Sequence, residues 1–179
     1  MKRLLNIIEI YASFIFIFFD LMLGYVGISS MAKPIDLDLF VRNNNLNKDT
    51  SAETVASVIN RSFVLNANDS NSLYAKHPLS LLTDKFGSCA DFALFCECIL
   101  IKAGFEDVYK LHVKNSIGKS NIVCIAKFSD GFYWQVSYWP EFQLSSANMI
   151  DQAKIIALKL GGQPIFCAKV IGYYVTDYA

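Results

Sequence analysis

The period of the hydrophobic pattern changes from helical to strand-like near residue 105. Beyond that point, apolar and polar residues alternate over 107–114, 121–128 and 132–139, which predicts three strands. The turn residues Ser129-Asp130-Gly131 separate the last two strands, so we expect these strands to pair antiparallel. A further stretch at 164–175 predicts one more strand.

The segment 88–102 predicts a central helix. Ser88 is a good N-cap with Asp91 three residues later, which makes Cys89 the first helical residue. The residues that follow are apolar nearly all round the helix, as expected of a helix that is buried on every side. Lys102 and a glycine just beyond it match the preferences of a helix end.

Three other helices are predicted around this one. A capping-box sequence opens a helix over 50–65, a short helical piece follows Pro78 and ends near residue 85, and a serine caps a helix over 145–160. Helices come first and a meander of strands follows. This order predicts an α+β fold with helices packed on one face of an antiparallel sheet, in a single domain that we place at 50–179.

Residues 1–32 form an apolar stretch that starts with two positive charges and is predicted to be helical. We call residues 4–31 the N-terminal apolar segment. Its polar and small residues fall on one narrow stripe of a helix, at Asn6, Glu9, Ser13, Asp20, Gly24 and Gly27.

Three interpretations of the N-terminal apolar segment stay open. As a membrane-spanning helix, residues 10–31 would extend roughly 33 Å, about one hydrocarbon thickness. The segment also fits a cleaved secretory signal, or a soluble helix packed against a partner in an assembly. The first two interpretations make the protein membrane-associated or exported. The polar residues 33–49 are predicted to be a linker or loop.

Composition excludes several classes of function. The 16 basic residues equal the 16 acidic ones, so no nucleic-acid partner is expected. The five cysteines are odd in number and three fall on the central helix, which indicates reduced thiols rather than a disulfide framework. The chain has no CxxC pair and only two histidines, far apart, so neither a metal nor a cofactor is predicted. The partner we expect is a protein or a peptide.

Cys89 is the first candidate for chemistry. A helix N-terminus carries free N–H groups and about half a positive charge, which together stabilise a thiolate and lower its pKa. The same N–H groups would serve as an oxyanion hole for acyl transfer. The alternative is a buried thiol that packs as a small hydrophobe. We interpret Asp91 as the acid of the capping box, and we expect Glu97 to face solvent or to pair with Lys102.

The run Gly87-Ser88-Cys89-Ala90-Asp91-Phe92-Ala93 and the apolar helix after it resemble the nucleophile segment of the transglutaminase-like superfamily. The later strands, with Asp130-Gly131-Phe132-Tyr133-Trp134, resemble its histidine-bearing strand, turn and aspartate-bearing strand. The resemblance spans residues 50–140. It implies a papain-like arrangement, with the cysteine helix against the sheet, and a Cys-His-Asp triad used for acyl transfer or peptide hydrolysis.

The chain departs from the family pattern at two of the three triad positions. Matching the strands places the family's histidine at Asn121, with Ile122 as the one close alternative, and its aspartate at Ser137. Asparagine cannot take a proton from a thiol, and serine cannot orient an imidazolium as a carboxylate does. His112 is the candidate replacement for the base. If Lys114 pairs with Asn121, His112 lies on the same sheet face as Asn121, one pair further from the loop.

Three functions follow as hypotheses. The first is a degenerate transglutaminase-like domain that keeps Cys89, lacks the usual base and acid, and binds a protein or peptide partner. The second is an active thiol peptidase or acyltransferase, with Cys89 as nucleophile, His112 as base, and Asn121 orienting the base or stabilising an oxyanion. The third is a small structural subunit of an assembly, held by its first helix.

Overall fold

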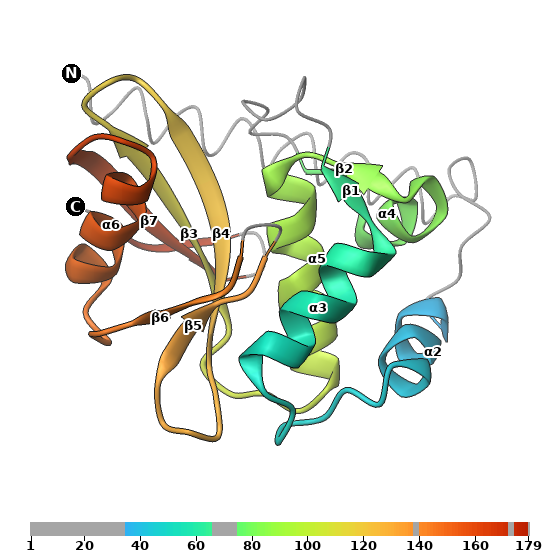
Figure 1. Ribbon diagram of the computed structural model, residues 1–179. Helices are drawn as coiled ribbons and strands as arrows, with labels where there is room; N and C mark the ends of the chain where they lie inside the picture. Colours follow the sequence, from blue (N-terminus) through green and yellow to red (C-terminus); the bar gives the residue numbers. More distant parts are fainter. Residues whose placement is uncertain (1–34, 66–74, 138–139, 172–173, 179) are drawn as a thin grey trace.

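The computed structural model describes residues 35–65, 75–137, 140–171 and 174–178 (Figure 1). The helices are α2 (Ile35–Asn43), α3 (Ala52–Ser62), α4 (Pro78–Asp84), α5 (Cys89–Lys102) and α6 (Met149–Lys159). The strands are β1 (Val64–Leu65), β2 (Phe86–Gly87), β3 (Tyr109–Asn115), β4 (Ser120–Lys127), β5 (Tyr133–Gln135), β6 (Phe142–Leu144), β7 (Pro164–Ile171) and β8 (Tyr174–Tyr178).

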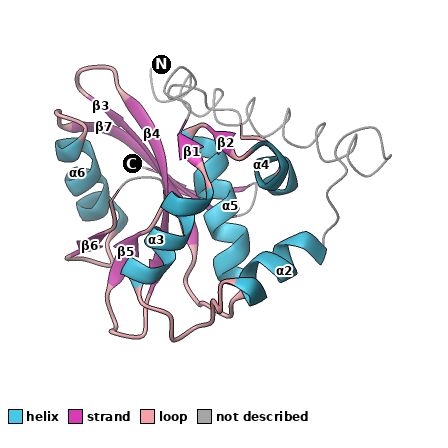
Figure 2. Cartoon of the chain, turned by 45° about the vertical axis from the view of Figure 1, so that its right-hand side comes forward, coloured by secondary structure: helices cyan, strands magenta, loops and turns pink. Residues whose placement is uncertain are grey.

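The main sheet is antiparallel throughout and has the strand order β6-β5-β4-β3-β7-β8. Helix α5 packs on β4, and α2 and α4 contact α5 from its other sides (Figure 2). This side of the sheet holds the larger hydrophobic cluster, in which Phe92 and Phe95 of α5 lie near Phe63 at the end of α3. A short parallel pair, β1 with β2, lies next to the start of α5.

The expectation that the helices cover a single face of the sheet is wrong. Helix α6 packs on the opposite face, against β3 and β7 (Figure 1). Its residues Ala153 and Ile156 form a second cluster with Leu111, Val123 and other residues of the strands. The reason lies in the strands, because β3 and β4 are buried along nearly their whole length, so both of their faces need a cover.

The segment 33–49 was predicted to be a linker or loop, but residues 35–43 form helix α2. Leu37 and Val41 are spaced by one helical turn and are both buried in the cluster around α5. Acidic residues lie in the first turn of α2 and Arg42 lies in its last, which suits the helix dipole. An exposed ion pair between Asp38 and Lys102, 2.7 Å long, also joins α2 to α5.

Other boundaries differ in detail. Helix α3 starts after Ser51 rather than Thr50, and Asn148 rather than a serine caps α6. The strand expected over 132–139 ends at Gln135, and β6 follows Pro140 as an additional edge strand. The strand expected over 164–175 is divided between β7 and β8.

The apolar helix expected over 1–32 lies outside the described residues. Among the helices that the structure does describe, none combines the length and the hydropathy needed to cross a membrane.

Candidate active site

Cys89 is the first residue of α5, as the capping pattern predicts. The Ser88 hydroxyl accepts a hydrogen bond from the Asp91 backbone N–H at 3.3 Å, and the Asp91 carboxylate accepts one from the Ser88 N–H at 2.6 Å. The same carboxylate also accepts from the backbone N–H of Lys76. Asp91 therefore closes the capping box and also ties the segment before α4 to the start of α5.

The thiol of Cys89 is enclosed. Only 3% of the residue is exposed, and this burial raises the pKa of the thiol, with the negative charge of Asp91 adding to the rise. Hydrogen bonds from the backbone of Ile122 and Ala90 act in the opposite direction but do not reverse the shift. The favourable helix N-terminus is thus outweighed by desolvation, so the pKa does not fall as expected of a reactive cysteine.

His112 lies on β3, directly opposite Ile122 of β4. Its Nε2 is 2.6 Å from the Ser120 hydroxyl, and its ring packs edge-on against Phe166 with the centroids 5.9 Å apart. Among the described residues, Nδ1 has no hydrogen-bond partner. Burial, together with the positive charge of Lys114, lowers the pKa of His112 to about 4, so the imidazole is neutral near pH 7.

The strand register separates two of the predicted site residues from Cys89. Val113, not Lys114, pairs with Asn121, so the expectation that His112 and Asn121 share a face is wrong. Asn121 alternates in β4 with Val123, which packs in the α6 cluster, whereas α5 packs on the face that carries Cys124. Asn121 therefore lies on the α6 face of the sheet.

Ser137 lies on the α6 side as well. Its hydroxyl is 2.6 Å from the side-chain amide of Gln135, which pairs with Ile125 of the α6 cluster. Of the four predicted site residues, Cys89 and His112 are on the α5 face of the sheet, and Asn121 and Ser137 are on the opposite one.

A buried ion pair lies further along α5. Glu97 was expected to face solvent or to pair with Lys102, but it is 2% exposed and pairs with Lys110 of β3, which is 4% exposed. The signal was present in the pattern, because each is a charged residue inside an otherwise apolar element. Cys98 and Cys124 lie near this pair; burial raises the pKa of both thiols, and the negative charge of Glu97 adds to the rise.

A groove that the structure shows among the described residues lies away from Cys89. It has a volume of about 370 Å³ and lies between α2 and α4, and neither Cys89 nor His112 lines it. Among the described residues, no group of three or more His, Cys, Asp or Glu side chains is arranged to hold a metal ion.

Residues 27–156 match the family described as the transglutaminase-like domain. The chain belongs to this family. The resemblance of the Cys89 segment to that superfamily is therefore confirmed, and the matched region begins before helix α2, which lies in the segment predicted to be a linker.

Among solved structures, the chain is similar to LapG of Legionella pneumophila, with a TM-score of 0.50, 13% identity, and 76% of each chain covered. A structure of EGTA-treated LapG has a TM-score of 0.46 and 14% identity, and the match covers 75% of this chain and 71% of that one. A calcium-bound LapG structure has a TM-score of 0.46 and 13% identity, and the match covers 79% of this chain and 76% of that one. No curated protein matches the chain. At this identity the likeness indicates a shared fold, a transglutaminase-like mixture of helices and antiparallel sheet.

Proposed function

We propose that this chain is a non-catalytic transglutaminase-like domain that acts by binding a protein or peptide partner. The observation that carries the proposal is the strand register. The residues at the family's histidine and aspartate positions, Asn121 and Ser137, lack acid–base chemistry and lie on the sheet face away from Cys89. A nucleophilic thiol needs a base beside it, and these two positions do not supply one.

The electrostatics of the remaining pair supports the same conclusion. Burial raises the pKa of the Cys89 thiol and lowers that of His112 to about 4. A thiol that holds its proton, and an imidazole too weakly basic to take it, remain a neutral pair near pH 7. Thiol proteases work from the opposite state, in which a thiolate lies beside a protonated imidazole.

One observation favours the second candidate, an active thiol peptidase or acyltransferase. His112 and Ile122 form a cross-strand pair, and the backbone of Ile122 hydrogen-bonds to Cys89. His112 and Cys89 are therefore next to the same residue on one face of the sheet. In this candidate, a substrate-induced rearrangement turns the imidazole from Ser120 toward the thiol, and His112 acts as the base.

The test is the pH dependence of Cys89 alkylation in the full chain, read for each cysteine by peptide mass spectrometry. We expect Cys89 to react slowly at pH 7 to 8, with a rate that still rises above pH 9 and is unchanged in His112→Gln. Cys98 is the matched control, because it lies on the same helix and its pKa is also raised, to about 11. A rate that levels off below pH 8 and falls in His112→Gln would instead establish a working pair.

A turnover assay separates the two candidates at the level of activity. Wild type and Cys89→Ala are compared on a library of quenched fluorescent peptides. The proposal predicts equal, background rates for both proteins. Cleavage by wild type alone would overturn it.

A further inference from the structure

One side of β7 carries buried apolar residues. Phe166, Ala168 and Val170 are each at most 3% exposed, and they alternate along the strand on one face. Ala168 pairs with His112 of β3, so this is the face on which α5 lies. The opposite face of β7 is covered by α6, because Cys167 packs in the α6 cluster. We call the three residues the β7 strip.

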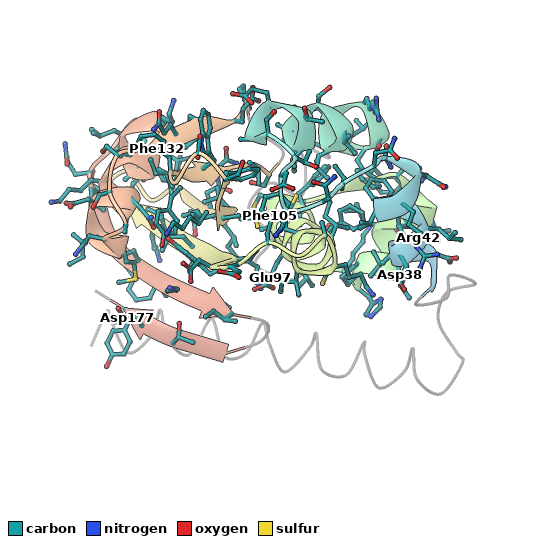
Figure 3. All side chains as sticks on the ribbon, turned by 90° about the horizontal axis from the view of Figure 1, so that it is seen from below. Asp38, Arg42, Glu97, Phe105, Phe132 and Asp177 are labelled. Carbon is teal, nitrogen blue, oxygen red and sulfur yellow. The ribbon has the colours of Figure 1, made fainter. Side chains whose placement is uncertain are left out.

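The β7 strip lies outside the clusters that the described helices form with the sheet. Its three residues belong to neither the cluster around α5 nor the cluster around α6, and α5 lies over β4. Figure 3 shows β7 and β8 extending beyond α5 at the lower left. The described contact of the strip on this side is the ring of Phe166 against His112. A strip of this kind needs an apolar cover.

We propose that the cover is the N-terminal apolar segment of this chain, residues 4–31, packed as a helix across the α5 side of β3 and β7. The length of the segment fits the path. It must lead into α2, which lies on the far side of α5 from β7 (Figure 1). As a helix it would extend about 42 Å. The path crosses α5, which is about 10 Å wide, and then the three strand spacings from β4 to β8, which add about 14 Å, so the helix is long enough.

The polarity of the segment also fits this position better than a bilayer. Its polar and small residues lie on one narrow stripe, and large apolar residues occupy the rest of the helix. Packed on the sheet, the helix places apolar residues against the β7 strip and leaves Glu9 and Asp20 at its solvent edge. In a spanning helix, Asp20 would lie near the bilayer centre, where a carboxylate is unfavourable.

Site-specific photocrosslinking in cells that produce the full chain tests the proposal. The photoreactive residue p-benzoylphenylalanine replaces Tyr178, which is 55% exposed and pairs with Ala168, so it lies on the side of the β7 strip. The matched control carries the same residue at Asp177, which is also exposed, pairs with Lys169 and lies on the other face. Crosslinked peptides are identified by mass spectrometry.

We expect position 178, and not position 177, to crosslink to residues 4–31 within a single chain. A crosslink between two chains at position 178 would show that a second copy covers the strip and would overturn the proposal. Lipid adducts, equal crosslinking from both positions, or an intact mass that lacks residues 4–31 would overturn it as well. Because neither position touches Cys89 or His112, failure here leaves the proposed function to its own tests.

Discussion

Gly87, two residues before Cys89, shows at the scale of a single residue why this chain needs a glycine at that position. A methyl group on Gly87 would lie 2.8 Å from an oxygen of Asp91 and 2.8 Å from a methyl carbon of Leu81. Asp91 cannot move aside, because its carboxylate is held by backbone N–H groups of Ser88 and Lys76. The glycine is therefore required by close packing at the start of α5.

Gly87→Ala should lower the free energy of unfolding by about 2–3 kcal/mol, the upper part of the range for overpacked sites. The control is Gly131→Ala, where nothing lies within 4 Å of the added methyl group and only the positive φ of 84° is unfavourable. We expect about 1 kcal/mol there. Urea denaturation measures both, and equal losses would contradict the packing argument.

His112 should make stability depend on pH in the mildly acidic range. The unfolded chain takes up a proton near pH 6.5, whereas the folded state resists protonation down to about pH 4. The unfolded state binds more protons in this window, so stability falls as pH falls through it, by about 3 kcal/mol in total. Denaturation at several pH values should show this loss in wild type and a smaller one in His112→Gln.

The control for that experiment is His77→Gln, which replaces the chain's other histidine, the N-cap of α4. If both variants change the pH profile equally, the effect does not come from the buried ring of His112.

At the scale of the elements, α5 and β3 are joined by the buried pair of Glu97 and Lys110. Removing one partner leaves the other charge buried without compensation. Glu97→Leu or Lys110→Met should therefore cost about 3–5 kcal/mol, while the double variant Glu97→Leu/Lys110→Met should be close to wild type or more stable. The exposed pair of Lys154 and Asp151 is the control, and Lys154→Met should cost less than about 1 kcal/mol.

A double-mutant cycle by chemical denaturation measures this coupling. Additive losses in the double variant would show that the pair contributes no interaction across the α5–β3 interface.

The elements also show how far the sequence predicts this site. Ser88 and Asp91 predicted the start of α5 correctly, because capping depends only on local residues. The predicted β3–β4 register was wrong by one residue, because the register depends on the conformation of the turn between the two strands. Asn115 closes a tight loop by accepting hydrogen bonds from Ile117 and Lys119, which leaves Lys114 opposite Ser120. Such a shift turns Asn121 to the other face.

At the scale of the whole molecule, the fold class could be read from the order of helices and strands, but the layers could not. That α6 covers the second face of the sheet depends on which strands are buried on both sides, a tertiary property that an alternating pattern conceals. The same holds for α2, whose polar composition hides a two-residue apolar face, Leu37 and Val41.

The molecule has the fold of the transglutaminase-like family, with Cys89 at the start of the central helix α5. Cys89 is buried, His112 is a buried neutral ring, and Asn121 and Ser137 lie on the α6 side of the sheet. On this account the preserved helix start is a structural feature, stabilised by Asp91 and Gly87.

The most direct measurement is the protonation state of the His112 ring, read from its imidazole nitrogen chemical shifts by NMR in wild type and Cys89→Ala. We predict a neutral ring at pH 7 that stays neutral down to pH 5, identically in both proteins. A ring that is protonated at pH 7 in wild type and loses its proton in Cys89→Ala would reveal a thiolate–imidazolium pair. That result would contradict the account and establish this domain as a thiol enzyme.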